Sequence, residues 1–362
     1  MGVFESIGSD THEEILFGVD HESQLRTIIA IHNTALGPAL GGTRFFPYGS
    51  EQEALRDVLR LSKGMTYKSA AAGLDLGGGK GVIIGDPGTM KSERLLRAYA
   101  SVVESLGGRY ITAEDVGTTV EDMVMIKRST RHVAGLPPTY GGSGDPSPAT
   151  ARGVFRAMEA VAAHLWGSRD LAGKTIAVQG IGKVGMSLVE RLTEAGVEVV
   201  VADVNPAAID HAATRFGTKT VELEELYSVD CDIFAPCALG ATINPDTIPL
   251  LRTAAIAGSA NNQLATDADA DLLETYGIVY APDFVANAGG VINIAVEREG
   301  YSTDRAAAMV DGIFDNVTAV LRTSAEDSVN TNVAAQRVAE RRIATVGSLR
   351  LKRRPGEEKG AS

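Results

Sequence analysis

Residues 175–203 read TIAVQGIGKVGMSLVERLTEAGVEVVVAD, and this stretch decides the fold. It predicts a strand, a glycine-rich turn, a helix and a second strand, in that order, at residues 175–179, 180–185, 186–195 and 197–202. Three further short apolar strands are predicted downstream, at residues 233–235, 255–257 and 278–280. Strands and helices that alternate in this way build a parallel, doubly wound sheet.

The glycine-rich turn matches a known binding pattern. Gly180-Ile181-Gly182-Lys183-Val184-Gly185 fits GxGxxG, follows a predicted strand and opens a predicted helix. In that setting the glycines allow a tight turn, close approach of a pyrophosphate and close packing of helix on strand. The pyrophosphate then lies at the helix N-terminus, which favours anions. The alternative interpretation is a glycine-rich turn without a ligand.

The second strand ends at Asp203, a residue that can distinguish the two nicotinamide dinucleotides. Its carboxylate can accept hydrogen bonds from both ribose hydroxyls and would repel a 2′-phosphate. No arginine or lysine occurs in the following residues, 204–207. The pattern therefore favours NAD over NADP as the cofactor.

Composition limits the class of protein. The chain has 362 residues, enough for two domains, and its net charge of −12 argues against nucleic acid as a partner. No apolar run approaches the roughly 18 residues of a membrane span, and no secretion signal is recognisable, so we expect a cytoplasmic protein. The histidines show no metal-ligand spacing, and Cys231 and Cys237 are expected to be buried thiols rather than a disulfide.

The rest of the chain also alternates strands and helices. Strands are predicted at residues 26–32, 81–84 and 109–112, and helices at residues 51–63, 93–106, 304–324 and 332–346. Residues 135–148, GLPPTYGGSGDPSP, favour a crossing between two domains, after which Ser147 is predicted to cap a helix. The basic cluster at residues 350–354 is interpreted as the start of a solvated tail.

A second glycine-rich segment delivers a lysine. Residues 74–82 read LDLGGGKGV, which fails as a phosphate-binding loop because Lys80 is followed by Gly81 rather than Ser or Thr. Lys68 lies upstream, and two cations in one site would suit an anionic substrate. Burial and a neighbouring charge would also lower the pKa of Lys80 towards the range of a general base. From these residues alone, two unrelated solvated lysines remain an equal alternative.

Several long motifs together resemble one enzyme family. They are LGPALGGTR at residues 36–44, LDLGGGKGVIIGDP at 74–87, YITAEDVG at 110–117, PSP at 146–148, AGSANNQL at 257–264, YAPD at 280–283 and NAGGV at 287–291. Their order and content resemble the glutamate, leucine, phenylalanine and valine dehydrogenase family, and among these the leucine-type enzymes most. The resemblance extends to about residue 346. It implies a reversible, NAD-dependent oxidative deamination of an L-amino acid to a 2-oxo acid and ammonia.

The resemblance also implies a role for individual residues. Lys68 would bind the substrate α-carboxylate, Lys80 would be the general base that activates water, and Asp115 would relay protons from the amino group. Gly41 and Gly42 would offer backbone contacts near the substrate. Three residues would position the nicotinamide and its ribose, with Asn262 also close to the substrate: Thr150, Asn262 and Asn287.

The implied side-chain pocket is apolar, lined by Leu40, Ala113, Val291 and Ile294. In the glutamate enzymes the position of Leu40 carries a cation that pairs with the distal carboxylate of the substrate. Burying that carboxylate unpaired beside a leucine would cost several kcal/mol, so we expect Leu40 to exclude glutamate. We expect leucine as the first substrate, with isoleucine and valine. Ile294 stands where a valine is usual in the leucine-type enzymes, which narrows the pocket. A valine or phenylalanine dehydrogenase is the alternative, and a catalytically silent NAD-binding protein is the alternative from another class.

We therefore expect two α/β domains. Residues 1–134 with 330–362 would form an N-terminal substrate-binding and oligomerisation domain, and residues 135–329 a Rossmann-type NAD-binding domain. A cleft between them would close on the substrate and exclude water. The resemblance implies a homo-oligomer, either the leucine-type octamer or a dimer.

Overall fold

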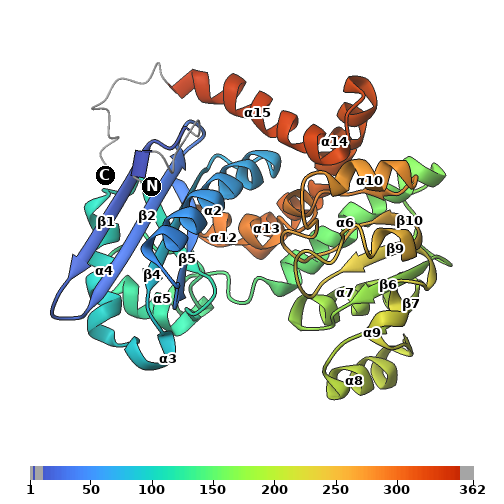
Figure 1. Cartoon of the computed structure of the whole chain (residues 1–362), viewed down its shortest axis with the longest axis horizontal. Coiled ribbons are helices and arrows are strands. Elements are labelled where there is room, and N and C mark those ends of the chain that lie inside the picture. The colour runs from blue at the N-terminus through green and yellow to red at the C-terminus, as the bar shows by residue number, and fades with distance from the viewer. Residues whose placement is uncertain (1–2, 5–10, 351–362) are drawn as a thin grey trace. The chain divides into compact units, whose positions relative to one another are not determined.

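The computed structural model describes residues 3–4 and 11–350, and the chain divides into two compact units (Figure 1). The first unit comprises Met1–Gly142 with Ala339–Ser362, and the second comprises Ser143–Val338. The sequence places the same two boundaries slightly earlier, after residues 134 and 329. The end of the basic cluster predicted as a solvated tail, residues 351–354, lies outside the described residues.

The first unit contains a five-stranded mixed sheet with the order β1-β2-β4-β3-β5. Its strands are β1 (Glu14–Asp20), β2 (Leu25–Asn33), β3 (Ala39–Phe46), β4 (Gly77–Ile84) and β5 (Tyr110–Glu114). β2 runs antiparallel to β1 and β4, whereas β3 runs parallel to β4 and β5. Since residues alternate between the two faces of a strand, the register decides which side chains meet.

Helices cover both faces of this sheet. They are α2 (Glu51–Ala71), α3 (Pro87–Met90), α4 (Glu93–Ser105) and α5 (Val120–Lys127), followed by the short 3-10 turn η1 (Pro138–Tyr140). One face packs on α2, whose residues Leu55 and Val58 contact the cluster that contains Ala30 and Val82. The other face packs on α4 and α5.

In the first unit, one helix and one strand extend well beyond their predicted bounds. The helix predicted at residues 51–63 continues to Ala71 as α2, because Gly64 lies on its exposed side and does not end it. The strand predicted at residues 81–84 begins at Gly77 as β4. A Cβ at Gly78 would overlap Thr66 of α2, so Gly78 lets the helix lie close to the strand.

The second unit contains a six-stranded parallel sheet with the order β11-β10-β9-β6-β7-β8. Its strands are β6 (Thr175–Gln179), β7 (Glu198–Ala202), β8 (Lys219–Thr220), β9 (Asp230–Pro236), β10 (Arg252–Ile256) and β11 (Val279–Tyr280). Numbered within this unit, the order is 3-2-1-4-5-6, that of a Rossmann fold. The predicted α/β class with a doubly wound second domain is confirmed.

The helices of the second unit are interrupted by short turns. They are α6 (Ser147–Trp166), α7 (Lys183–Glu194), α8 (Pro206–Phe216), α9 (Leu223–Leu226), η2 (Ile248–Leu250), α10 (Asp269–Thr275), α11 (Asp283–Ala286), α12 (Gly289–Val296), η3 (Glu297–Glu299), α13 (Thr303–Asp311) and α14 (Ile313–Asp327). The last helix, α15 (Thr331–Arg350), continues into the first unit.

Two local predictions are wrong. Ser147 does not cap α6 but is its first residue, with Pro146 in the cap position, and its N–H donates to Asp145. The single helix predicted at residues 304–324 is divided at Gly312 into α13 and α14. Both cysteines are free thiols, as predicted, but only Cys231 is buried, and Cys237 is half-buried. Within the described residues, no helix is long and apolar enough to cross a membrane.

Candidate active site

Lys80 is a buried cation in the middle of β4. Its neighbours in the strand, Gly79 and Gly81, face Tyr110 and Tyr99 on the opposite side of the sheet. Lys80 therefore lies on the α2 face, and only 5% of it is exposed. Burying a charge costs several kcal/mol unless it is paired, so the surroundings of this ammonium group decide its chemistry.

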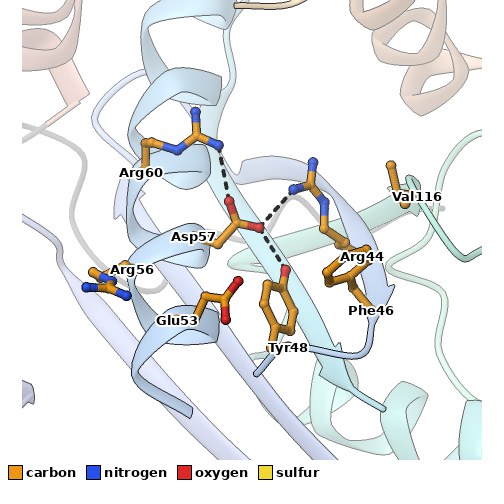
Figure 2. Close-up of a pocket in the computed structure, with 8 residues that line it drawn as sticks. All are labelled: Arg44, Phe46, Tyr48, Glu53, Arg56, Asp57, Arg60 and Val116. Atoms are coloured by element: carbon orange, nitrogen blue, oxygen red, sulfur yellow. Dashed lines mark hydrogen bonds and ion pairs between the residues drawn. The ribbon is translucent and has the colours of Figure 1, made fainter. Parts of the chain in front are cut away.

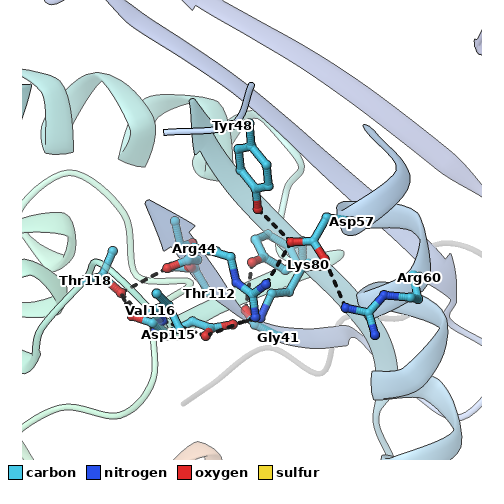
Figure 3. Close-up of polar contacts among 12 residues, drawn as sticks. Gly41, Arg44, Tyr48, Asp57, Arg60, Lys80, Thr112, Asp115, Val116 and Thr118 are labelled. Carbon is cyan, nitrogen blue, oxygen red and sulfur yellow. Dashed lines mark hydrogen bonds and ion pairs between the residues drawn. The ribbon is translucent and has the colours of Figure 1, made fainter. Parts of the chain in front are cut away.

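Asp115 is the partner of Lys80 (Figure 3). Its carboxylate forms an ion pair with the lysine Nζ and also accepts the N–H of Val116 at 2.6 Å. The turn that carries Asp115 is fixed by Thr118, whose hydroxyl accepts the Asp115 N–H and donates to the carbonyl of Thr43 on β3. The structure thus brings the two predicted catalytic residues together.

Arg44 and Asp57 extend this ion pair into a network. Arg44 on β3 contacts Asp57 of α2 with one arm, at 2.8 Å, and Asp115 with the other, at 3.8 Å. Asp57 also accepts the Tyr48 hydroxyl at 2.7 Å and Arg60 at 3.1 Å. Two carboxylates and several cations therefore share one face of the sheet.

This environment lowers the pKa of Lys80 to about 7. Burial is the main cause, because it penalises the charged ammonium, and the positive charge of Arg44 adds to it. Asp57 acts in the opposite direction, and so does the ion pair with Asp115, since a carboxylate stabilises the ammonium. The result is a lysine that can exchange a proton near neutral pH.

The other predicted residues of the first unit lie nearby. Lys68 is in the last turn of α2, and its charge also lowers the Lys80 pKa. Leu40 and Ala113 are buried, and in the parallel pairing of β3 with β5 Gly42 lies beside Ala113. By strand alternation Leu40, Gly42 and Ala113 share the Lys80 face. An apolar surface therefore adjoins the buried ion pair.

Gly41 has a structural reason to be glycine. A Cβ at this position would overlap the carbonyl oxygen of Gly79. The carbonyl of Gly41 accepts a hydrogen bond from the Tyr110 hydroxyl at 2.7 Å. A Cβ at Gly42 would likewise lie 2.5 Å from the carbonyl of Glu114. Close packing of β3 between β4 and β5 therefore accounts for both glycines.

The turn at residues 180–185 lies where the strand order of the second sheet reverses, between β6 and β9. Gly180 adopts a φ of 90° and lies against Ala238, which follows β9. A Cβ at Gly185 would overlap the Gly180 carbonyl, whereas Gly182 faces open space. Gly182 occupies the cap position of α7 and offers no side-chain acceptor, so the first N–H groups of that helix lack a side-chain cap.

Asp203 follows β7 and is tied to this turn. Its carboxylate accepts the N–H of Ile181 at 2.7 Å and the N–H of Asn205 at 2.8 Å. Each oxygen retains acceptor capacity, because an ionised carboxylate can accept about four hydrogen bonds. Lys183 is exposed and lies 3.8 Å from Asp145, whereas Val184 is half-buried.

The remaining predicted residues lie around the start of α6 and α12 of the second unit. Thr150 donates to the carbonyl of Pro146 and lies close to Gly290, at the start of α12. Asn287 is buried and donates to the side chain of Asn261, and Asn262 has a positive φ of 52°. Val291 and Ile294 lie on α12, three residues apart, so they share one face of that helix.

A surface pocket adjoins the Arg44–Asp57 pair (Figure 2). It has a volume of about 490 Å³ and is lined by Arg44, Phe46, Tyr48, Glu53, Arg56, Asp57, Arg60 and Val116. Lys80 and Asp115 are not among the lining residues. The pocket therefore borders the charge network without containing the buried ion pair.

Comparison with protein families identifies the chain. Residues 15–132 match the Glu/Leu/Phe/Val dehydrogenase dimerisation domain, and residues 141–212 and 202–350 match the Glutamate/Leucine/Phenylalanine/Valine dehydrogenase model. The chain belongs to this dehydrogenase family. It is an amino acid dehydrogenase, as the resemblance of its motifs indicates.

The dehydrogenase is similar to characterised relatives over almost its whole length. It is 53% identical to the leucine dehydrogenase of Bacillus cereus, with 96% of this chain and 95% of the relative covered. It is 49% identical to the valine dehydrogenase of Streptomyces virginiae, with 92% and 94% covered. The crystal structure of L-tryptophan dehydrogenase from Nostoc punctiforme matches with a TM-score of 0.87 and 43% identity, covering 95% of this chain and 99% of that one.

The sequence of the dehydrogenase did not reveal the roles of Arg44 and Asp57. Arg44 ends the LGPALGGTR motif, but nothing in the motif indicates what the guanidinium contacts. Asp57 lies one residue before the apolar Val58 and Leu59 of α2 and is one acidic residue among 46. The signal in the sequence that could have indicated Asp57 is its place beside the apolar face of the helix, where its side chain is half-buried in the structure.

Proposed function

We propose that this dehydrogenase uses NAD to deaminate branched-chain L-amino acids oxidatively and reversibly, with leucine preferred and valine and isoleucine accepted. The products are the 2-oxo acid and ammonia. The observation that carries the proposal is the buried Lys80–Asp115 ion pair on the same sheet face as the apolar residues Leu40 and Ala113. The similarity to the leucine dehydrogenase of Bacillus cereus supports the choice of substrate.

In this proposal the first unit binds the amino acid. Lys68 pairs with the α-carboxylate, and the backbone of Gly41 and Gly42 lies along the substrate. Leu40 and Ala113 of this unit receive the side chain. The resemblance of the motifs assigns Val291, Ile294 and Asn262 to substrate binding as well. Glutamate is rejected because no cation at position 40 compensates the burial of its distal carboxylate.

The second unit binds NAD. The open position at Gly182 and the uncapped N-terminus of α7 fit a pyrophosphate, and Asp203 fits the two ribose hydroxyls. Ile181, Lys183 and Val184 complete the loop, and Thr150, Asn262 and Asn287 position the nicotinamide ribose. The bound cofactor would supply the acceptor for the hydride that leaves the substrate Cα.

Lys80 and Asp115 move the protons. Asp115 takes the proton from the substrate ammonium, which leaves the neutral amine that can lose hydride and become an iminium. Neutral Lys80 then removes a proton from water as the oxygen attacks the iminium carbon. Asp115 returns its proton to the nitrogen and becomes a carboxylate again. The C–N bond then breaks and ammonia leaves, while the hydroxyl proton passes to the Asp115 carboxylate as the carbonyl forms.

A substrate panel tests the proposal. The purified protein is assayed for NADH absorbance with NAD or NADP and with leucine, isoleucine, valine, phenylalanine or glutamate. We expect the highest kcat/KM with leucine and NAD, and a value for glutamate at least about 1,000-fold lower. A preference for phenylalanine would refute the pocket argument. Absence of NADH with every amino acid would indicate the catalytically silent alternative.

A valine dehydrogenase is the second candidate. Ile294 narrows the proposed pocket, and the valine dehydrogenase of Streptomyces virginiae is almost as similar as the leucine enzyme. One methylene changes the free energy of transition-state binding by about 1–3 kcal/mol, so the leucine-to-valine ratio of kcat/KM decides between the two.

We also propose that the first unit mediates assembly into a homo-oligomer, a dimer or the leucine-type octamer. The matched family description names a dimerisation domain over residues 15–132. β1 is an edge strand with Phe17 and Val19 exposed, and such an edge favours pairing with another chain. Light scattering after size exclusion gives the subunit number, and a monomer at micromolar concentration would refute this part.

A further inference from the structure

Arg44 lies between two carboxylates that belong to different parts of the first unit (Figure 3). Its Nη1 contacts Asp57 of α2 at 2.8 Å, and its Nη2 lies 3.8 Å from Asp115, which follows β5. A guanidinium suits this place because its planar group offers several donors in fixed directions, whereas a lysine offers a single point charge. Arg44 thus connects the proposed proton relay with the helix opposite.

Asp57 is held firmly in its ionised form. It accepts hydrogen bonds from Tyr48 at 2.7 Å and from Arg60 at 3.1 Å, besides the contact with Arg44. Its pKa is lowered, because these donors outweigh the burial that would raise it. Burial, together with the hydrogen bond to Asp57, raises the pKa of the Tyr48 hydroxyl. Asp57 is therefore an anchor that keeps its negative charge throughout the neutral range of pH.

We propose that Arg44, anchored by Asp57, is a positioning residue that holds the Asp115 carboxylate against Lys80 and sets the balance of charge around that lysine. The inference rests on the function proposed above. Arg44 touches neither the substrate nor the cofactor in this account, but acts through Asp115 and through its charge.

The charges around Lys80 act in opposite directions. β3 contributes Arg44, and α2 contributes Lys68 and Arg60, which all favour the neutral amine. Asp57 on α2 and Asp115 after β5 favour the ammonium. On β2, the strand on the other side of β4, the nearest titratable group is His32, whose Nδ1 is hydrogen-bonded to Thr66.

Two substitutions should therefore shift the pH profile in opposite directions. Arg44→Gln removes a positive charge, so the Lys80 pKa rises and the acidic limb of kcat/KM moves to higher pH by about 0.5 to 1 unit. Asp57→Asn removes a negative charge, so the limb moves to lower pH by a similar amount. Arg56→Gln is the matched control, because Arg56 is exposed on α2, the helix that carries Asp57, and its replacement removes the same charge as Arg44→Gln. Its limb should stay within about 0.2 units of the wild type.

The conservative variant Arg44→Lys separates charge from geometry. It should restore the position of the acidic limb but not kcat, because an ammonium cannot contact both carboxylates as the guanidinium does. We expect kcat to stay about tenfold below the wild type. Full recovery of kcat with lysine would contradict the positioning role.

A readout without turnover distinguishes this inference from the proposed function. Labelling with acetic anhydride at a series of pH values, followed by peptide mass spectrometry, reports the titration of Lys80 relative to the exposed Lys219. The same opposite shifts should appear there, even if the natural substrate were another amino acid. Shifts in the same direction, or no shift in either variant, would overturn the inference. If Arg44→Gln does not fold, the direction of the Asp57→Asn shift decides the question.

Discussion

Replacing Lys80 by methionine removes the proposed base while filling most of its buried volume. The surroundings lower the pKa of Lys80 from 10.5 to about 7. A shift of about 3.5 units corresponds to about 5 kcal/mol. An unshifted lysine would be neutral in only about one molecule in 3,000 at pH 7, whereas Lys80 is neutral in about half. The ion pair with Asp115 favours the ammonium, so the kinetic pKa should lie at or somewhat above 7.

The assay is kcat/KM for leucine and NAD between pH 5.5 and pH 10, followed by NADH absorbance. The wild type should lose activity below about pH 7 to 8, as Lys80 becomes protonated. Lys80→Met should lower kcat/KM by about 100- to 10,000-fold and abolish this limb, without weakening NAD binding measured by calorimetry. Lys219→Met, at an exposed lysine of the second unit, is the control. Activity of Lys80→Met within tenfold of the wild type, or an unchanged acidic limb, would refute the reasoning.

Three further predictions follow from the same structure. Gly41→Ala should lower the free energy of unfolding by about 1–3 kcal/mol or more, because the new Cβ overlaps the Gly79 carbonyl. Gly64→Ala, at an open position in α2, should raise the free energy of unfolding by about 0.5–1 kcal/mol. Thermal melts of both variants check this contrast. Asp203→Ser should lower the preference of kcat/KM for NAD over NADP at least about tenfold, since the group that repels a 2′-phosphate is lost; an unchanged ratio would mean that another residue selects the cofactor. Lys80 should also make stability depend on pH, because between about pH 7 and pH 10.5 the unfolded chain binds more protons than the folded one. The unfolding free energy of the wild type minus that of Lys80→Met should therefore rise by about 1 kcal/mol per pH unit over this range. Urea titrations measure this difference, and a difference that does not change with pH would contradict the lowered pKa of Lys80.

The sequence predicts the second sheet well because its signals are local. Apolar runs at residues 175–179 and 197–202 flank a glycine turn, and both lie within one or two residues of the observed strands β6 and β7. The three glycines before Lys80 indicate a buried strand, but these residues alone leave a solvated lysine as an equal alternative, and the resemblance of the motifs is needed to decide. Local periodicity is less informative where tertiary packing decides, as at the continuation of α2 past Gly64.

The charge network is beyond the reach of sequence reasoning for the same reason. Arg44 and Asp57 are thirteen residues apart and belong to a strand and a helix, and neither lies in a pattern that indicates its partner. Their pairing depends on the angle at which α2 crosses the sheet. The resemblance of motifs indicates Lys80 and Asp115, but only the folded unit shows that the Arg44 guanidinium lies 3.8 Å from the Asp115 carboxylate.

Isotope transfer tests the central claim most directly, because it follows the atoms of the reaction. The protein is incubated with NAD and leucine deuterated at Cα, and the products are analysed by NMR and by an ammonium assay. We expect deuterium at C4 of the reduced nicotinamide, with equal amounts of the 2-oxo acid and ammonium. Formation of NADH without deuterium, or of the oxo acid without ammonium, would contradict it.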